Sequence, residues 1–293
     1  MDKADLIADQ LGETTTIPSS SSGKRGGRAG GSRAVDLSRA LSRLLRHQAS
    51  SAGIELDKEG YAPLDKVLSW GPVKSLSPTF SEILSAVADS DKQRFALKPL
   101  ASETSTNPQD WLIRANQGHS IKLDSENLLK PLAIEPDEAK GELPIPETVV
   151  HGTYFAFWEL IKSSGGLKKM GRNHVHFSTG LPDGEGVVSG MRRDAELLVY
   201  ADVARAMREG GLKFWMSENG VVLTEGDGEG KVGLEFFREV VGRDGGVVGV
   251  IWRDGEAVEG GRLPEGLRIR VPQGKGGRGG RGHRGGRGRG RGQ

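Results

Sequence analysis

Glycine and charge are spread so unevenly along this chain that only its middle part can build a packed core. The last twenty residues, Gly274 to Gln293, are Arg-Gly repeats with one histidine, His283, one lysine, six arginines and no acid. This tail contributes +7 to a net charge of +2, so residues 1–273 carry −5. With nothing apolar to bury, the tail is predicted to be disordered and to make salt-sensitive, nonspecific RNA contacts. The alternatives are a solubilising tail or one that binds protein.

The first 35 residues are also predicted to be disordered, because a serine cluster leads into GKRGGRAGGSR, which has nothing to bury. The N-terminus lacks the basic and apolar regions of a secretory signal. No apolar run approaches the roughly 20 residues of a membrane helix. The absence of cysteine excludes disulfides and thiolate metal sites. We therefore expect a soluble protein without membrane contacts, in the cytoplasm, the nucleus or both.

A helix with an apolar face and a cationic face is predicted to begin after Asp36, a plausible N-cap. Leucines and an alanine recur at helical spacing between Leu37 and Leu45, and three arginines fall on another face. The helix ends in the pair Arg46-His47. Cations in a last helical turn also complement the helix dipole, which would explain this pair without any function.

A second polar cluster follows a short apolar run, in the stretch Leu112–Ser120, which reads LIRANQGHS. Residues with strand propensity give way here to hydrogen-bonding side chains, and Arg114 offers a planar fork suited to phosphate. The alternative is a strand end with a solvated loop. We also predict strands at residues 94–97 and 121–123, and helices from Leu64 and over residues 77–88. Three helices and a few short strands fit a winged-helix type of domain, which often binds nucleic acid.

The second half of the chain predicts a mostly antiparallel β domain that follows a linker rich in proline and acid. Strands are expected around Phe177, at residues 196–200 and after the turn Asn219-Gly220, and a short helix at residues 234–241. The predicted organisation is α+β, with these parts: 1–35 disordered flank, 36–134 winged-helix-like lobe, 135–147 linker, 148–241 second lobe, 242–273 uncertain extension, 274–293 disordered tail.

Four motifs together carry a family resemblance. They are LSRLLRH ending at Arg46-His47, IRANQGHS around Arg114, HGT at 151–153 followed by HVHFSTG, and SGMRR with NGVVLT between residues 189 and 224. Over residues 36–240 the chain resembles the RNA 2′-phosphotransferases of the Tpt1/KptA type. The resemblance implies a winged-helix-like RNA-binding lobe and an ADP-ribosyltransferase-like NAD lobe.

The implied reaction removes the splice-junction 2′-phosphate from ligated tRNA, or from another 2′-phosphorylated RNA, with NAD+ as co-substrate. The phosphate attacks the nicotinamide ribose and expels nicotinamide. The 2″-hydroxyl then attacks phosphorus, which releases ADP-ribose 1″,2″-cyclic phosphate. A phosphate monoester is largely dianionic near pH 7, since its second pKa is about 6, and is a competent nucleophile without a general base. The site therefore needs cations rather than the catalytic glutamate of many ADP-ribosyltransferases.

The resemblance also implies the site residues. The expected catalytic tetrad is Arg46, His47, Arg114 and Arg192. The expected NAD+ contacts are His151, Gly152, Thr153, His176, Ser178, Asn219 and Gly220. No metal is expected, because the pair His174 and His176 has no third ligand at a recognisable spacing. We expect a monomer.

Two other functions stay open at this stage. One is an ADP-ribosyltransferase that caps terminal phosphates of nucleic acid or modifies protein. The other is an RNA-binding protein without catalysis.

Overall fold

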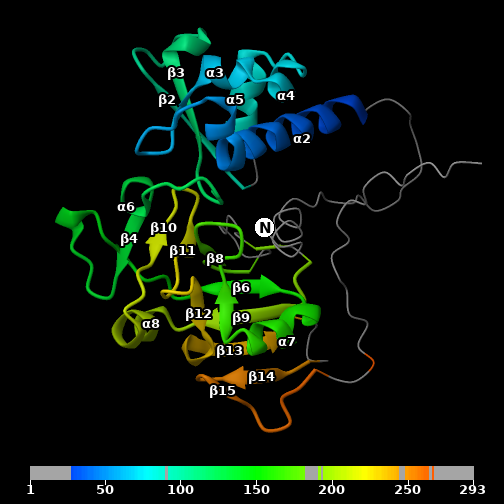
Figure 1. The fold of residues 1–293 in the computed structure, drawn as a ribbon, viewed down its shortest axis with the longest axis vertical. Coiled ribbons are helices and arrows are strands. Elements are labelled where there is room, and N and C mark those ends of the chain that lie inside the picture. Colours follow the sequence, from blue (N-terminus) through cyan, green and yellow to red (C-terminus); the bar gives the residue numbers. More distant parts are fainter. Residues whose placement is uncertain are drawn as a thin grey trace, which may run out of the picture.

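The computed structural model describes residues 28–89, 92–181, 191–192, 194–243, 248–263 and 266, with side chains described from Arg33 onward. The rest of the predicted N-terminal flank and the whole Arg-Gly tail lie outside these residues. The described part is α+β with a large, mainly antiparallel sheet, which confirms the predicted class at that level. Figure 1 shows a helical region at the top and the large sheet below it.

The helical region packs four α-helices around a small antiparallel sheet with strand order β1-β3-β2. Its core contains Leu41, Leu64, Ile83 and Ile113, all fully buried. The elements are α2 (Arg28–Arg43), a π-helical turn (Leu44–Gln48), a 3₁₀ turn (Ser50–Ala52), β1 (Ala62–Pro63), α3 (Leu64–Ser69), α4 (Gly71–Lys74), α5 (Phe80–Ala88), β2 (Phe95–Pro99), a 3₁₀ turn (Pro108–Asp110) and β3 (Trp111–Ala115).

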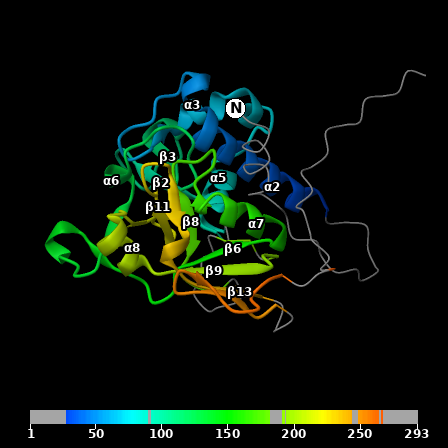
Figure 2. The ribbon, with the colours of Figure 1, turned by 60° about the horizontal axis from the view of Figure 1, so that its bottom comes forward.

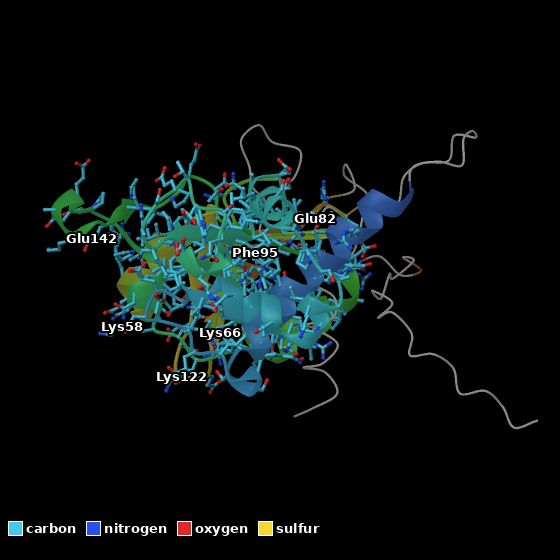
Figure 3. The ribbon with its side chains drawn as sticks, turned by 90° about the horizontal axis from the view of Figure 1, so that it is seen from above. Lys58, Lys66, Glu82, Phe95, Lys122 and Glu142 are labelled. Carbon is cyan, nitrogen blue, oxygen red and sulfur yellow. The ribbon has the colours of Figure 1, made fainter. Side chains whose placement is uncertain are left out.

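The first helix begins earlier than predicted, at Arg28, so Asp36 lies inside it and is not its N-cap. A long-range contact explains the extension. Arg33 Nε donates to Glu82 Oε1 at 2.6 Å, and this glutamate belongs to α5. Figure 3 shows Glu82 beside α2, with Phe95 nearer the middle of the helical region. A tertiary ion pair of this kind is not visible in local propensity.

Two further local predictions for this region were wrong. The cap of α5 is Thr79, not Ser77, because Thr79 and Glu82 form a reciprocal capping box. Residues 121–123 form no strand, and the third strand of the small sheet is instead β1, which pairs Ala62 with Ile113.

The large sheet has ten strands in the order β15-β14-β13-β9-β6-β8-β11-β10-β4-β5, and only β4 and β5 run parallel. A separate pair joins β7 to β12. The elements are α6 (Ser125–Leu128), β4 (Lys130–Ala133), a 3₁₀ turn (Glu138–Lys140), β5 (Leu143–Pro144), β6 (Val150–Thr153), α7 (Phe155–Ser163), β7 (Gly166–Lys168), β8 (Val175–Ser178), β9 (Leu197–Ala201), α8 (Val203–Gly210), β10 (Trp215–Met216), β11 (Val221–Thr224), β12 (Lys231–Gly233), a 3₁₀ turn (Leu234–Phe236), β13 (Phe237–Gly242), β14 (Val250–Arg253) and β15 (Glu256–Ala257).

The sheet is larger at both ends than the sequence indicated. β4 and β5 join it before residue 148, so part of the predicted linker is a strand. The helix predicted at residues 234–241 was wrong, since this segment is a 3₁₀ turn followed by β13. Val240 faces the sheet core fully buried, and β13 pairs with both β9 and β14. Sheet pairing outweighs the local helical spacing here.

Hydrogen bonds join the helical region to the sheet at the loops between them, and Figure 2 shows the two regions from a second direction. Asn219 Nδ2 donates to the Lys92 carbonyl at 2.9 Å, and the backbone N–H of Asn173 donates to the His119 carbonyl at 2.9 Å. The segment that leaves β3 is therefore bonded directly to the loop that enters β8. None of the helices in the described ranges combines the length and hydrophobicity that a membrane span requires.

Candidate active site

The first helix and the stretch after β3 meet at the pair Arg46-His47. The carbonyl oxygen of Arg46 accepts hydrogen bonds from the backbone N–H groups of Ser120, at 3.0 Å, and Ile121, at 3.2 Å. His47 Nδ1 lies 2.9 Å from Ser120 Oγ. Gly118 has a φ of +88°, which favours glycine, and a Cβ atom there would be in ordinary contact with the Arg46 side chain at 3.5 Å, so this loop lies against Arg46. Two motifs more than seventy residues apart thus form one unit.

A π-helical turn, not the last turn of an α-helix, presents this pair. The α-helix ends at Arg43, and Leu44–Gln48 form the π turn. Leu44 and Leu45 enter the core, while Arg46, only 8% exposed, faces the Gly118 loop. The predicted exposed cationic face therefore does not include Arg46. Single π turns within helices are frequent at functional sites.

His119 lies at the centre of this cationic group and is only 2% exposed. Burial, reinforced by the charges of Arg46 and of other cationic groups including Arg114, lowers the pKa of His119 to about 3. The imidazole is therefore neutral at pH 7. Its buried Nε2 has no hydrogen-bond partner among the described residues. A protonated ring would be repelled by the charges of both arginines, and a neutral ring is not.

Arg114 is held on β3 by three different contacts and is 12% exposed. Its Nη1 donates to the Glu59 carbonyl at 3.0 Å, and its guanidinium lies over the Tyr61 ring, 4.7 Å from the centroid. Its Nη2 donates to Glu218 Oε2 at 2.7 Å, across the junction with the sheet. The guanidinium is thus oriented by the helical region and directed at the loop between β10 and β11.

The seven expected NAD+ contacts lie on two adjacent strands of the large sheet and on the turn before a third. His151, Gly152 and Thr153 belong to β6, His176 and Ser178 to β8, and Asn219-Gly220 precede β11, in the strand order β6-β8-β11. His151 Nδ1 lies 2.8 Å from the His176 carbonyl, which ties β6 to β8. Pairing of Val150 with Ser178 and of Val221 with Ser178 fixes the register. The sheet therefore gathers all three groups.

Two half-buried histidines on these strands are neutral at pH 7. Burial lowers the pKa of His151 and, more strongly, that of His176, and the nearby Arg172 charge acts in the same direction on both. The buried Nε2 of His176 has no hydrogen-bond partner among the described residues. An orphaned polar atom in a buried site is costly unless a ligand or water satisfies it. This atom therefore marks a position where a polar ligand would be bound.

Gly152 is required by a close approach. A Cβ atom there would lie 2.5 Å from Met191 Sδ and 2.8 Å from the Ala195 Cβ. Arg192 follows this methionine and donates from Nη1 to the Tyr154 hydroxyl at 3.0 Å, with its guanidinium 5.5 Å from the centroid of the same ring. Arg192 therefore lies by β6 and α7 in the sheet region. Hydrogen bonds thus join Arg46 and His47 to the loop after β3, Arg114 to Glu59 and Glu218, and Arg192 to Tyr154.

The remaining expected contacts have structural partners. Ser178 is fully buried and donates from Oγ to the Gly180 carbonyl at 2.6 Å. Asn219 accepts from Ser217 Oγ at 2.8 Å and bonds Lys92 in the helical region. Gly220 has a φ of +73°, which a turn before a strand needs and which favours glycine. These residues shape the turn and tie the regions together.

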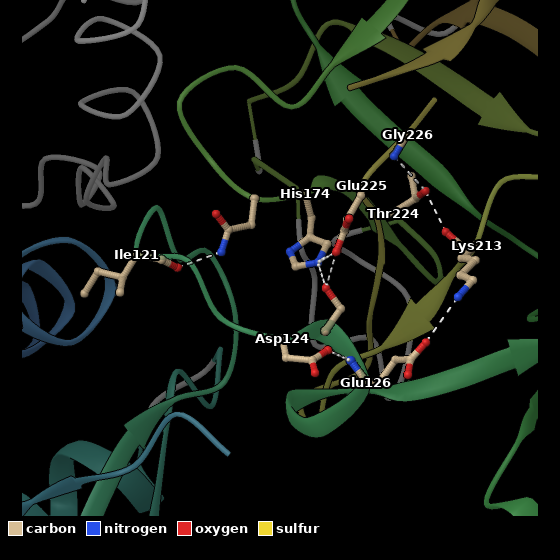
Figure 4. Close-up of polar contacts among 10 residues, drawn as sticks. Ile121, Asp124, Glu126, His174, Lys213, Thr224, Glu225 and Gly226 are labelled. Carbon is tan, nitrogen blue, oxygen red and sulfur yellow. Dashed lines mark hydrogen bonds and ion pairs between the residues drawn. The ribbon is translucent and has the colours of Figure 1, made fainter. Parts of the chain in front are cut away.

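His174 is buried in a separate polar network below the Gly118 loop. Its Nε2 lies 2.8 Å from Ser125 Oγ, which in turn donates to Glu225 Oε1 at 2.5 Å. Figure 4 shows this network, with His174 next to Glu225. Burial, the largest effect, lowers the pKa of His174 to about 4 although the Glu225 charge opposes it. Ser125 and Glu225 both approach Nε2 of His174. The network therefore holds these segments together structurally and does not resemble a nucleophile activated by a base.

Several residues of the site received no role from the sequence. His119 and Ser120 stood in the quoted motif, and Tyr154 directly follows HGT, so adjacency to the motifs was the available signal. Glu218 directly precedes NGVVLT and Arg172 stands two residues before HVHFSTG, so the same signal existed for them, but the contact of Glu218 with Arg114, 104 residues earlier, could not be predicted. Across the described ranges, no group of three or more His, Asp or Glu side chains forms a candidate metal site.

Comparison with known proteins places this chain among enzymes of one kind. The family model described as RNA 2′-phosphotransferase, Tpt1 / KptA family, matches residues 32–226. The chain is 41% identical over 216 residues to tRNA 2′-phosphotransferase 1 of Danio rerio, an alignment covering 73% of this chain and 88% of that protein. It is 35% identical over 211 residues to tRNA 2′-phosphotransferase of Saccharomyces cerevisiae, covering 71% and 84%. A probable RNA 2′-phosphotransferase of Rhizobium leguminosarum is 34% identical over 191 residues, covering 65% and 89%.

Proposed function

Because this chain belongs to the RNA 2′-phosphotransferase family, we propose that it removes the splice-junction 2′-phosphate from ligated tRNA by transferring it to NAD+. The products are RNA with a 2′-hydroxyl, nicotinamide and ADP-ribose 1″,2″-cyclic phosphate, formed through an RNA 2′-phospho-ADP-ribose intermediate. The observation that carries the proposal is that Arg46 and His47 are bonded to the loop that follows β3, the strand of Arg114, and that the charges of all three residues act on His119 in this loop.

These three residues supply what a phosphate monoester nucleophile requires. A dianionic 2′-phosphate needs no general base, since its second pKa is about 6. It needs cations that hold it in line with the anomeric carbon of the nicotinamide ribose and that stabilise charge on phosphorus in the second step. Arg114 is held by Tyr61 and the Glu59 carbonyl, so little side-chain entropy is lost when it binds phosphate. His47 is oriented through Nδ1 by Ser120 and is proposed to contact the same phosphate.

The β6 and β8 residues are proposed to hold NAD+. The fit rests on the orphaned Nε2 of His176 and on the closeness of Arg172 to His151 and His176, which would favour an anionic ligand. When bound, NAD+ supplies the electrophilic ribose carbon and nicotinamide as leaving group. Neutral His151 and His176 can donate or accept hydrogen bonds there without adding charge beside the cationic nicotinamide ring. Thr153, Ser178, Asn219 and Gly220 are proposed to shape this cleft.

Arg192 is proposed to act from the NAD side. Its guanidinium is anchored on Tyr154, the residue that follows the three expected NAD contacts of β6. A phosphate that bridges RNA and the nicotinamide ribose would meet Arg46, His47 and Arg114 from one region and Arg192 from the other. The helical region would thus supply three residues of the tetrad and the sheet region the fourth.

The finer architecture is proposed on the same basis. The three-stranded sheet with its helices is taken as a winged-helix-like RNA-binding lobe. The large sheet is taken as an ADP-ribosyltransferase-like NAD lobe, and we place its start before β4 rather than at residue 148, because β4 pairs with β10. The enzyme is proposed to act as a monomer in the cytoplasm, the nucleus or both, and its Arg-Gly tail to add nonspecific RNA contacts.

The proposal is tested by incubating the full chain with NAD+ and an RNA that carries one internal 2′-phosphate. We expect one nicotinamide released for each 2′-phosphate lost, and none with the matched RNA that has a 2′-hydroxyl. Stable ADP-ribose on a 5′-phosphorylated RNA, without release, would instead identify a capping ADP-ribosyltransferase. RNA binding with no nicotinamide release from any substrate would identify a non-catalytic RNA-binding protein.

A further inference from the structure

The Arg114–Glu218 ion pair places a carboxylate on the guanidinium that is proposed to bind the phosphate. Glu218 Oε2 accepts from Arg114 Nη2 at 2.7 Å, and the two residues are separated by 104 positions in the chain. Arg114 is 12% exposed, whereas Glu218 is 56% exposed. A buried cation and an exposed anion therefore meet at the mouth of the proposed site. The Glu218 carboxylate accepts from Arg114 Nη2, the donor that an oxygen of the RNA phosphate would use under the proposed function.

The turn that carries Glu218 is fixed on both sides of it. Ser217 is 3% exposed, and its Oγ accepts the Val221 N–H at 3.0 Å and donates to Asn219 Oδ1 at 2.8 Å. Asn219 is held in turn by the Lys92 carbonyl. The hydrogen bond and ion pair described for the Glu218 carboxylate are both to Arg114. The Glu218 side chain can therefore rotate into solvent while the backbone turn keeps its hydrogen bonds. What is lost is the contact with Arg114.

We infer that Glu218 is a specificity-determining residue, which keeps the phosphodiesters of the RNA backbone out of the Arg114 site while a phosphate monoester can still displace it. This inference rests on the proposed function. To reach Arg114 Nη2, any phosphate must displace a carboxylate that carries one negative charge. A backbone diester also carries one charge, so the exchange gains no charge. A monoester carries about −1.5 to −2 at pH 7 and three acceptor oxygens, so it gains both charge and hydrogen bonds.

The other nitrogen atoms of the Arg114 guanidinium also favour a phosphate monoester over a diester. Its buried Nε has no hydrogen-bond partner among the described residues, while Nη1 is engaged by the Glu59 carbonyl. A monoester has enough oxygens to take the place of the carboxylate and to approach other cations of the cluster at the same time. A carboxylate has two oxygens, and the diester has two non-bridging oxygens. RNA lacking a 2′-phosphate offers only diesters, and Glu218 would keep it from occupying the site as a competitor.

The test uses the full chain without NAD+, so that binding is measured and no reaction occurs. Two RNAs of the same sequence are compared, one with an internal 2′-phosphate and one with a 2′-hydroxyl, at one fixed salt concentration because RNA binding depends strongly on salt. The variant is Glu218→Gln, which keeps the shape and removes the charge. The matched control is Glu126→Gln, which removes the same charge from the exposed pair with Lys213, where the atoms lie 3.1 Å apart.

For wild type we expect the phosphorylated RNA to bind more tightly. Glu218→Gln should make the unphosphorylated RNA bind about tenfold more tightly, because its diesters can then occupy the Arg114 site, and it should also tighten binding of the phosphorylated RNA, which no longer has to displace a carboxylate. Glu126→Gln should leave both dissociation constants unchanged. An unchanged dissociation constant of the unphosphorylated RNA in Glu218→Gln, or the same tightening in Glu126→Gln, would overturn the inference.

Failure of this inference can be told apart from failure of the proposed function. If wild type releases nicotinamide with the phosphorylated RNA and Glu218→Gln binds the unphosphorylated RNA with wild-type affinity, only the role of Glu218 is wrong. If wild type does not distinguish the two RNAs and releases no nicotinamide, the assignment of the site itself is wrong.

Discussion

His47 Nδ1 and Ser120 Oγ lie 2.9 Å apart, and this contact orients the imidazole at the point where the first helix meets the loop after β3. The Ser120 backbone N–H is also bonded to the Arg46 carbonyl, at 3.0 Å. One residue thus sets both the position of the pair and the direction of the histidine ring. Ser120 is a positioning residue, since it acts through His47.

Replacing Ser120 with alanine should lower kcat while leaving the KM for NAD+ unchanged. The loss of one hydrogen bond to the ring corresponds to about 1 kcal/mol, or about fivefold in rate. The measurement is steady-state nicotinamide release at saturating RNA. Ser120→Thr keeps the hydroxyl and should recover most of the rate. A fall in affinity for NAD+ in place of kcat would contradict the role given to Ser120.

Changing Arg114 to lysine should reduce phosphate transfer by about a hundredfold or more. An ammonium keeps the charge but cannot donate to the Glu59 carbonyl and present a second fork nitrogen at the same time, nor lie flat over the Tyr61 ring. Single-turnover reactions with excess enzyme separate this loss from RNA binding. Lys98→Arg, at another cation near the Tyr61 ring, is the matched control and should keep the wild-type rate. Full activity in Arg114→Lys would show that charge alone suffices.

Gly152→Ala should destabilise the fold by about 1–3 kcal/mol and weaken NAD+ binding, because the new methyl group has no space. Its Cβ would lie 2.5 Å from Met191 Sδ and 2.8 Å from Ala195 Cβ. Adding Ala195→Gly should recover part of the stability. Gly71→Ala is the control, since a Cβ atom there meets nothing within 4 Å. Urea unfolding followed by fluorescence measures both variants, and equal stability of Gly152→Ala and wild type would contradict the close approach.

His119 should make the protein less stable in mild acid. The pKa of His119 is about 3 in the folded protein, against the ordinary 6.5. Below pH 6.5 the unfolded chain therefore binds a proton on this residue, whereas the folded protein does not until the pH approaches 3. Stability contributed by the neutral ring is therefore complete above pH 6.5 and falls as pH decreases toward 3. Between pH 7 and pH 5 this amounts to about 2 kcal/mol for one group.

His119→Gln removes the titrating group and should reduce the loss of unfolding free energy between pH 7 and pH 5 by that amount. The comparison is between slopes with pH, so a uniform loss of stability in the variant does not affect it. Equal slopes for the variant and wild type would mean that His119 is protonated in the folded protein.

Local patterns predicted the elements whose contacts are close in sequence. Helical spacing located the buried face that includes Leu41, and the alternation of Val175 with Phe177 located β8. The family resemblance pointed to Arg46, His47 and Arg114, whose charges all act on His119 in the structure, because each of them stands inside a recognisable motif. Elements governed by distant partners escaped prediction. The start of α2 depends on Arg33 and Glu82, and β13 depends on pairing with two strands.

The π turn and Glu218 escaped for related reasons. Apolar spacing from Leu37 to Leu45 fits an ordinary α-helix, and the inserted residue of the π turn is set by what Arg46 meets at Gly118. In the sequence, Glu218 is an acidic residue before the turn Asn219-Gly220, and nothing local distinguishes it from other exposed acids. Its significance comes from Arg114, which lies 104 residues earlier.

The central claim, that the phosphate is transferred to NAD+ and not hydrolysed, is tested most directly by following a radioactive label placed on the 2′-phosphate of the RNA. We predict that, with NAD+ present, all the released label appears in ADP-ribose 1″,2″-cyclic phosphate and that none is released without NAD+. Label recovered as inorganic phosphate, or released equally well without NAD+, would contradict this account.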